Sequence, residues 1–291
     1  MNALTPNDIA GRLGLARTRR GWRGDCPACG YTGTFVLTSK DGDPDAWCAS
    51  CRDGAAIRMK MQDIAGGKPV VYAERTAKPK DDGERTAKAL RCWEGAAAAE
   101  GSPARLYLVA RGLAHLATSP ALRWRPDNTH PERGREAVYD AMVALVRDGL
   151  GNPVAVHRTY INRQGRKSGL NPSKATLGPL HDGAIRLADP GKELVIGEGI
   201  ETSASLGLMM NLPAWAAVSA GHMPKVALPL IVRHVIVAMD PDPAGRRWGY
   251  AAARRWQAEG RRVSIAVPDR EDQDFNDILA ARSARGGPHA G

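Results

Sequence analysis

Two short apolar runs constrain the fold of this chain more than any other feature of its sequence. Residues 194–197 are followed directly by Glu198, and residues 235–239 are followed by Asp240 and then Asp242. Continuous apolar runs of this length are typical of strands that are buried on both faces of a parallel sheet. In an open α/β sheet, the carboxyl ends of such strands form the ligand crevice. The sequence therefore predicts an α/β core, a small and mostly parallel sheet with flanking helices, with acidic side chains at one edge.

The three carboxylates at this edge need a counter-ion if they lie close together. Two unit charges 4 Å apart repel by about 4 kcal/mol at an effective dielectric constant near 20. Mg²⁺ is a hard cation that takes oxygen ligands and commonly binds phosphates at the same time, so Glu198, Asp240 and Asp242 indicate metal-dependent phosphate chemistry. A structural alternative is that Asp242 caps a helix in which Pro243 is the first residue. Capping does not explain the acid at the other strand.

Two nucleotide-binding motifs are matched only in part. Gly197-Glu198-Gly199 resembles the start of the G-x-G-x-x-G dinucleotide fingerprint. That fingerprint needs an acid about 20 residues further on, where this chain has Ser-Ala-Gly-His at residues 219–222. Asp240 has the position of a Walker B acid, but the chain contains no G-x-x-x-x-G-K-[ST] motif. The sequence therefore disfavours both a dinucleotide-binding domain and an ATPase motor.

Four of the five cysteines form two C-x-x-C pairs, Cys26 with Cys29 and Cys48 with Cys51. The spacing between the pairs lies in the range of structural zinc sites, in which Zn²⁺ takes four thiolates tetrahedrally. A closed set of four thiolates leaves no open coordination position, so we predict one structural zinc ion. Apolar and aromatic residues between the pairs predict a hairpin, and the segment reads as a zinc ribbon. The alternatives are four unrelated cysteines or a redox dithiol.

The charge of the chain favours an anionic partner. The formal net charge is +10 and the sequence pI is about 9.6, a balance that most often indicates nucleic acid. Arginines interleaved with an aromatic residue suit single-stranded nucleic acid, and a basic loop ahead of the acidic runs suits a triphosphate or a template strand. The alternatives are a solvated basic turn and a solvated hairpin end. The candidate template- and nucleotide-binding residues are Arg20, Trp22, Arg23, Arg158, Lys167 and Lys174.

The sequence shows neither a membrane span nor a signal peptide. No stretch reaches the ~18 apolar residues of a transmembrane helix. The N-terminus lacks a basic region followed by an apolar one. We therefore expect a cytoplasmic protein with reduced thiols and with no membrane partner.

Three acidic segments carry a resemblance to a known family. Glu198-Gly199, residues 240–245 and residues 274–277 resemble the three acidic motifs of a Toprim domain, which bacterial and phage primases, type IA and type II topoisomerases and some nucleases share. A zinc ribbon ahead of a Toprim core resembles the bacterial primase arrangement. Residues 107–113, 157–160 and 176–178 resemble the Toprim primases of phages and mobile elements.

The resemblance implies a DNA primase that makes short RNA primers on single-stranded DNA from ribonucleoside triphosphates. Glu198, Asp240 and Asp242 would be its catalytic residues, with two or more Mg²⁺ or Mn²⁺ ions. The implied metal ligands are Glu198, Glu201, Asp240, Asp242, Asp274 and Asp277. The chain departs from the bacterial pattern at Thr202 and Asn276, where an acid is expected. Since no helicase motif is present, we expect a separate replicative helicase as a partner.

The domain order follows from the motifs. We expect a zinc-binding ribbon domain at 1–65, a linker at 66–90, an α+β basic subdomain at 91–190, a Toprim catalytic domain at 191–285 and a disordered tail at 286–291.

Two other Toprim functions remain as alternatives. A non-catalytic recombination-mediator clamp combines a zinc module with a Toprim fold, but the two lie close together in such clamps. Here about 140 residues separate Cys51, the last residue of the cysteine quartet, from the Toprim segment, which favours a primase. A Toprim nuclease would share the metal site without an obvious need for a zinc ribbon. A topoisomerase is disfavoured because 291 residues leave no room for a strand-passage gate.

Overall fold

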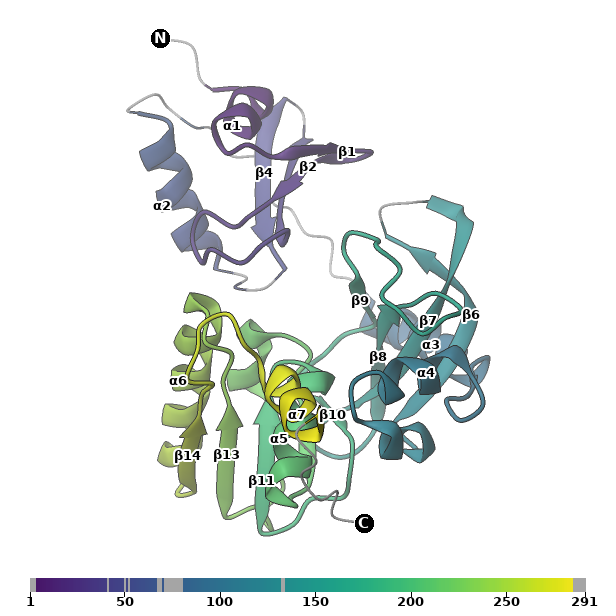
Figure 1. Cartoon of the computed structure of the whole chain (residues 1–291). Coiled ribbons are helices and arrows are strands. Elements are labelled where there is room, and N and C mark those ends of the chain that lie inside the picture. The colour runs from purple at the N-terminus through teal and green to yellow at the C-terminus, as the bar shows by residue number, and fades with distance from the viewer. Residues whose placement is uncertain are drawn as a thin grey trace. The chain divides into compact units, whose positions relative to one another are not determined.

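The computed structural model describes residues 4–40, 42–49, 51, 53–66, 70, 81–131 and 134–284, with the backbone alone at 134–136. The chain forms two compact units, Met1–Lys80 and Asp81–Gly291, and each is described by itself. Figure 1 labels their helices and strands. Within the ranges above, no helix has the length and apolar character that crossing a membrane requires.

The first unit is a four-stranded antiparallel sheet in the order β1-β2-β3-β4, accompanied by two helices. Phe35 and Leu37 of β3 are buried in its core, as are Ile57 and Met61 of α2. The expected hairpin is thus present, as β3 and β4. The elements are α1 (Pro6–Arg12), β1 (Ala16–Thr18), β2 (Gly21–Gly24), β3 (Phe35–Lys40), β4 (Asp43–Cys48) and α2 (Gly54–Ile64).

The C-terminal end of the expected linker needs a correction. Helix α3 (Asp82–Glu94) occupies residues that the sequence assigned to a linker ending at 90. Asp81 caps this helix by accepting a hydrogen bond from the Glu84 N–H, and two acids in its first turn suit the helix dipole. The helix belongs to the second unit. Residues 67–69 and 71–80 of the linker, and all of the expected tail at 286–291, lie outside the described residues.

Residues 81–187 form the α+β part of the second unit. Strand β7 is its longest, and it pairs in antiparallel fashion with β6, β8 and β10. Alternate residues of β7 face opposite sides of the sheet: Val143 lies in the core with Ala89 of α3, and Met142 in the core with Leu108 of α4. The remaining elements are β5 (Ala97–Ala98), α4 (Pro103–Val109), η1 (Ala114–Thr118), β6 (Leu122–His130), β7 (Gly134–Arg147), β8 (Pro153–Tyr160), β9 (Lys174–Leu177) and β10 (Ala184–Arg186).

Residues 193–284 form the parallel part of the same unit. Its strands run in the order β14-β13-β11-β12, and all three pairings are parallel. Val195 packs in the same core as Leu279 of α7, and Leu194 packs in the opposite core with Trp256 of α6. Burial on both faces explains the continuous apolar runs. The elements are β11 (Glu193–Gly197), α5 (Ile200–Met210), β12 (Ala214–Ala216), η2 (Ala220–Lys225), β13 (His234–Ala238), α6 (Pro243–Ala258), β14 (Arg262–Ala266) and α7 (Phe275–Ala284).

Strand β10 joins the two parts into one sheet. It pairs in antiparallel fashion with β7 of the α+β part and with β12 of the parallel part. In the parallel part, the chain leaves β11 toward β12 on one side and leaves β13 toward β14 on the other. The strand order therefore reverses between β11 and β13, and open α/β sheets bind their ligands outside the carboxyl ends of strands at such a point.

Candidate functional site

The acidic residues follow the carboxyl ends of β11 and β13. Gly197 and Ala238, the last residues of these strands, are paired in the sheet, so Glu198 and Asp240 leave the same edge. Two glycines permit close packing there. A Cβ added to Gly197 would lie 3.0 Å from the Ala238 carbonyl oxygen, and one added to Gly245 would lie 2.4 Å from the Asp240 carbonyl oxygen. A side chain at either position would displace the backbone that carries Asp240.

Asp240 is a carboxyl group in a setting that disfavours its charge. Burial, together with the negative charges of Asp242 and Asp274, raises the pKa of Asp240 to about 6. The Thr202 hydroxyl donates a hydrogen bond to Asp240 Oδ1 at 3.3 Å and opposes this shift. Thr202 thus supplies a donor where bacterial primases have an acid. The negative charges around Asp240 and the carboxylate oxygens that could act as ligands fit a hard divalent cation. Such a cation would favour the ionised form of Asp240.

Asp242 caps helix α6. Its Oδ1 accepts a hydrogen bond from the Gly245 N–H at 2.7 Å, and Pro243 is the first helical residue. The structural alternative weighed from the sequence is thus present at this residue. It does not extend to Asp240, whose carboxylate accepts from Thr202 and does not cap the helix. Asp242 therefore combines a cap with a negative charge that reaches Asp240.

Asp274 and Asp277 bind each other's backbone. The Asp274 N–H donates to Asp277 Oδ2 at 3.0 Å, and the Asp277 N–H donates to Asp274 Oδ1 at 2.9 Å. This reciprocal pattern is a capping box at the start of α7. The two acids were expected as metal ligands, and the i, i+3 spacing of a capping box was the signal that could have shown their local role. Asp274 still contributes to the field at Asp240.

Asn276 explains the second departure from the family pattern. Its Nδ2 donates to the Arg111 carbonyl oxygen at 2.8 Å and to Ser205 Oγ at 3.0 Å. These bonds connect α7 to α5 and to the residues after α4. An aspartate at this position has no N–H to donate, so the amide serves packing between the two parts of the unit.

Glu201 is buried, and its two oxygens are both engaged by the α+β part. Lys174 Nζ lies 2.9 Å from Oε2, and the Tyr107 hydroxyl donates to Oε1. Burial alone raises the pKa of Glu201, but Lys174 and Tyr107 more than offset this effect and hold it well below its usual range. The sequence placed Glu201 among the metal ligands, whereas here its partners are a cation and a hydroxyl. Tyr107 lies 94 positions away in the chain, so nothing local could have shown this contact.

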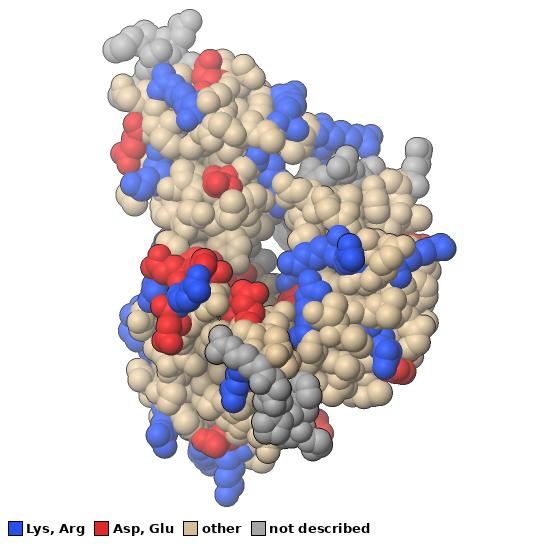
Figure 2. All heavy atoms as spheres, in the orientation of Figure 1, with Lys and Arg blue, Asp and Glu red and all other residues tan. Residues whose placement is uncertain are grey.

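Basic residues of the α+β part lie near this carboxylate. Burial lowers the pKa of Lys174, but the charge of Glu201 outweighs it, and the net shift is upward. Burial and the nearby Lys174 charge lower the pKa of Lys167. The Arg111 guanidinium stacks on the Tyr107 ring, 3.6 Å from its centroid. The sequence analysis quoted Arg111 within a motif but did not select it as a site residue. Figure 2 shows the acidic side chains of the parallel part beside basic side chains of the α+β part.

Arg158 differs from the expectation that it binds phosphate. It is 6 % exposed, and its Nη1 donates to the Thr129 carbonyl oxygen at 2.9 Å. Its guanidinium also lies 5.7 Å from the Tyr160 ring centroid. The hydrogen bond connects β8 to β6 across β7, the strand that pairs with both of them. Arginine patterns in a sequence do not distinguish such a structural role from a phosphate contact.

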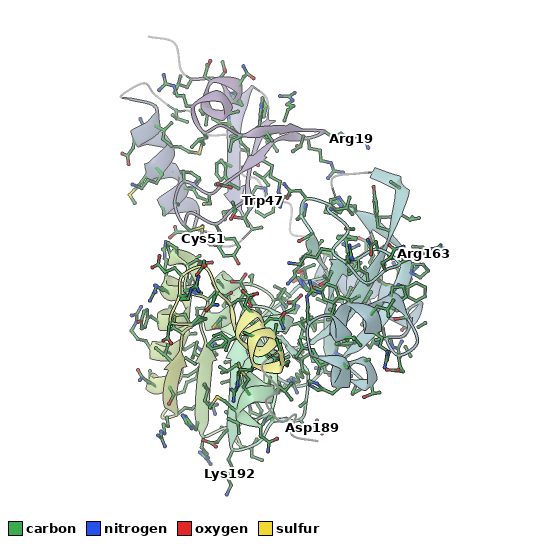
Figure 3. The ribbon with its side chains drawn as sticks, in the orientation of Figure 1. Arg19, Trp47, Cys51, Arg163, Asp189 and Lys192 are labelled. Carbon is green, nitrogen blue, oxygen red and sulfur yellow. The ribbon has the colours of Figure 1, made fainter. Side chains whose placement is uncertain are left out.

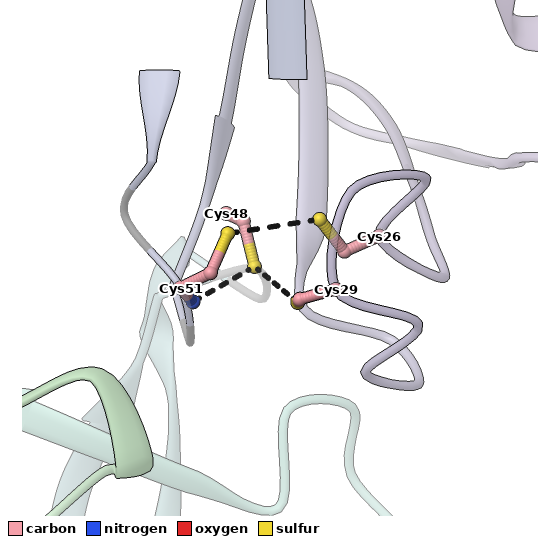
Figure 4. Close-up of side chains that lie close together, drawn as sticks. All are labelled: Cys26, Cys29, Cys48 and Cys51. Atoms are coloured by element: carbon pink, nitrogen blue, oxygen red, sulfur yellow. Dashed lines mark hydrogen bonds between the residues drawn. The ribbon is translucent and has the colours of Figure 1, made fainter. Parts of the chain in front are cut away.

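The four cysteines of the first unit meet as expected. Their sulfur atoms all lie within 4.8 Å of one another and are buried. The Cys26–Cys51 separation is 3.9 Å and the Cys29–Cys48 separation is 3.8 Å, as Figure 4 shows. A tetrahedron with Zn–S bonds of about 2.3 Å has edges of about 3.8 Å. The sulfur positions therefore fit one zinc ion, and both pairs contribute to one closed set. Among the described residues, no three acidic side chains come as close together as these four sulfur atoms.

The expected template-binding residues of the first unit divide into two groups. Arg23 is 9 % exposed, and its Nε donates to the Gly33 carbonyl oxygen at 2.6 Å, which fixes the loop after the first cysteine pair. Arg20 is exposed at the β1–β2 turn, beside Arg19, which Figure 3 labels. Trp22 is half-buried, and the Arg17 guanidinium lies 4.3 Å from its ring centroid. Arg20 and Trp22 therefore remain accessible, whereas Arg23 supports the zinc-binding loop.

The comparisons with known proteins agree with the sheet topology. Residues 193–285 match the family model described as the Toprim domain, and residues 83–187 match a domain of unknown function (DUF7146). The C-terminal part of the chain is therefore a Toprim domain, which confirms the prediction from the acidic motifs. No curated protein matches the chain.

Three solved primase structures are similar to this chain at low identity. The primase fragment of the bacteriophage T7 primase-helicase protein is 19% identical with a TM-score of 0.45, and covers 90% of this chain and 95% of its own. The Aquifex aeolicus primase fragment, with zinc-binding and RNA polymerase domains, is 14% identical with a TM-score of 0.48, covering 98% and 84%. The E. coli primase catalytic core is 17% identical with a TM-score of 0.41, covering 62% and 69%.

Proposed function

We propose that this chain is a DNA primase that synthesises short RNA primers on single-stranded DNA by metal-dependent nucleotidyl transfer. The observation that carries the proposal is that one compact unit contains both an acidic and a basic side of the site. A Toprim domain presents Glu198, Asp240 and Asp242 at the carboxyl ends of its strands, and the adjoining α+β part brings basic residues to the same carboxylates. Carboxylates suit divalent metal, and lysines suit the triphosphate that the metal accompanies.

The acidic edge would hold the metal. Asp240 and Asp242 are the proposed principal ligands, with Asp274 contributing charge, and Mg²⁺ or Mn²⁺ bound there would neutralise charge on the triphosphate and the attacking oxygen. Glu198 is the proposed general base. It would accept the proton of the primer 3′ hydroxyl as that oxygen bonds to the α-phosphorus of the incoming nucleotide. The bond from the α-phosphorus to the bridging oxygen breaks in the same transfer, and pyrophosphate leaves.

The zinc unit has the proposed role of contacting template. Arg20 and Trp22 combine a cation and an aromatic ring, which suits phosphate contact and base stacking on single-stranded DNA. The closed thiolate set supports this small unit and leaves no position for catalysis. We also propose a separate replicative helicase as partner. If no helicase co-purifies with the tagged chain from its source cells, that part of the proposal fails.

Primer synthesis can be tested directly. The full chain is incubated with single-stranded DNA, labelled ribonucleotides and Mg²⁺ or Mn²⁺, and the products are resolved by length. We expect short labelled oligonucleotides with the native chain, and none with Asp240→Ala. Asp189→Ala is the matched control, since Asp189 is exposed and lies near Lys192 (Figure 3). Lys192 precedes β11, whereas Asp240 follows the carboxyl end of the neighbouring parallel strand β13. It should retain activity.

Two outcomes would replace the proposal with its alternatives. Intact DNA binding with no product on varied templates would indicate a non-catalytic clamp of the recombination-mediator kind. Shortening of the DNA, with no RNA product, would indicate a Toprim nuclease that uses the same carboxylates.

A further inference from the structure

A partly buried three-residue contact joins the basic and acidic sides of the site. Glu201 on α5 accepts hydrogen bonds from Lys174 at the start of β9 and from Tyr107 on α4. We propose, on the basis of the primase function above, that Tyr107 and Glu201 are positioning residues. They fix the ammonium of Lys174 where it binds the triphosphate of the incoming nucleotide, and Glu201 does not coordinate metal.

The location of Lys174 supports this assignment. A Cβ added to Gly199 would lie 3.4 Å from Glu201 Oε2 and 3.8 Å from Lys174 Nζ. The ammonium therefore lies beside the backbone that directly follows Glu198. Its charge reaches Glu198, as the upward effect of that carboxylate on the pKa of Lys174 shows. Lys174 is thus a cation of the α+β part that lies at the acidic edge.

The environment of Glu201 argues against metal coordination. Its side chain is 10 % exposed and that of Lys174 is 31 % exposed, so the carboxylate is the more enclosed partner. One of its oxygens faces Tyr107 and the other faces Lys174. Burying an ion pair is costly unless its geometry is well defined and its remaining hydrogen-bonding groups are satisfied. A pair that meets both conditions fixes the position of a lysine that would otherwise sample many rotamers.

Lys174 can bind phosphate while it stays paired. An ammonium group has three N–H donors, and the bond to Glu201 uses one. The charged groups whose fields reach it include Glu201 from α5, Glu198 from the end of β11, Asp240 from the end of β13 and Arg111 from the residues after α4, with Lys167 from the β8–β9 segment. Arg111 is itself held on the Tyr107 ring. Tyr107 therefore supports two cations, one through its hydroxyl and Glu201 and one through its ring.

The test compares nucleotide binding with metal binding in the full zinc-loaded chain. A fluorescent ATP analogue reports the nucleotide dissociation constant, and Mn²⁺ binding is counted by electron paramagnetic resonance. We expect Lys174→Met to weaken nucleotide binding by about 10- to 100-fold, the range for loss of a charge-assisted hydrogen bond. Glu201→Gln should weaken it by about 10-fold. The double variant should bind the nucleotide no more weakly than Lys174→Met does. The number of Mn²⁺ ions bound per chain should stay unchanged in all three variants.

Conservative variants separate positioning from folding. Tyr107→Phe keeps the ring under Arg111 and removes only the hydroxyl, so it should weaken nucleotide binding by several-fold with the fold intact. It also keeps the proposal testable if Glu201→Gln does not fold. Glu259→Gln is the matched control, because it removes a carboxylate from the partly exposed pair with Arg255 and should leave nucleotide binding unchanged.

Two results would overturn the inference. Loss of one Mn²⁺ per chain in Glu201→Gln would make Glu201 a metal ligand. Unchanged nucleotide dissociation constants in folded Tyr107→Phe and Glu201→Gln would leave the contact a purely structural one. Neither result depends on primer synthesis. Nucleotide binding that responds as expected in a chain that makes no primer would sink the primase proposal and leave the positioning role standing.

Discussion

The raised pKa of Asp240 predicts that this carboxylate destabilises the fold when no metal is bound. Its pKa of about 6, against an ordinary 3.8, means that folding disfavours the ionised form. Each pKa unit is worth about 1.4 kcal/mol, so ionised Asp240 should cost about 3 kcal/mol of unfolding free energy. This loss of unfolding free energy is fully present above the pKa of Asp240 in the folded state and falls to about half at pH 5. It disappears below the pKa of the same group in the unfolded state. Asp240→Asn should therefore stabilise the metal-free protein at pH 8 and not at pH 3.

Hydrogen exchange can measure this effect within the second unit. Peptides from β11 and β13 report the opening free energy of the parallel sheet, separately from the zinc unit. We expect slower exchange in Asp240→Asn than in the native chain at pH 8 without Mg²⁺. Saturating Mg²⁺ should protect the native chain and not the variant, because a ligand that binds only the folded state stabilises it.

Thr202→Val is the companion variant. It removes the hydroxyl that donates to Asp240, so it should raise the pKa of Asp240 further. The ionised carboxylate should then lower the unfolding free energy by more than it does in the native chain. An Asp240→Asn variant that exchanges as fast as the native chain at pH 8, or one whose advantage persists unchanged at pH 3, would refute the electrostatic reasoning.

Three further predictions concern residues with defined contacts. Cys48→Ser should release the zinc ion measured by atomic absorption and impair primer initiation, while Mn²⁺ binding at Asp240 stays intact; full initiation without zinc would contradict a template-reading role. Gly245→Ala should lower the thermal midpoint and the activity together, because its Cβ would lie 2.4 Å from the Asp240 carbonyl oxygen and overpacking typically costs about 1–3 kcal/mol. Asn276→Asp should destabilise the second unit by about 1–3 kcal/mol, because the Arg111 carbonyl oxygen loses its donor. Unchanged urea midpoints would contradict the last two.

The sequence predicted the parts of the structure that local patterns determine. The runs at 194–197 and 235–239 are strands because burial on both faces requires continuous apolar residues. The cysteine spacing predicted one closed set because each C-x-x-C turn presents two thiolates together. The linker end at 90 was too late in the chain, because helix α3 starts at Asp82 and its cap at Asp81 marks the boundary.

The contacts of individual polar side chains were beyond the reach of the sequence. Glu201 and Asp240 both follow apolar strands, yet one meets a lysine and a tyrosine from distant segments and the other meets like charges. That difference arises from tertiary packing, which cannot be predicted from the spacing of residues along the sequence. Arg158 and Lys174 likewise occupy similar basic contexts in the sequence, while only Lys174 pairs with a carboxylate at the acidic edge.

The shared strand β10 limits how this protein can admit its substrates. Because β10 is hydrogen-bonded to β7 on one side and β12 on the other, the two parts of the second unit cannot swing apart as rigid bodies without breaking backbone hydrogen bonds. The Asn276 amide and the Glu201 contacts hold the same two parts together at other points. Access would then depend on side chains and on the segment between β8 and β9, which carries Lys167. We therefore expect the second unit to behave as a rigid frame, in which folding, and not nucleotide binding, sets the distance between the basic and acidic side chains.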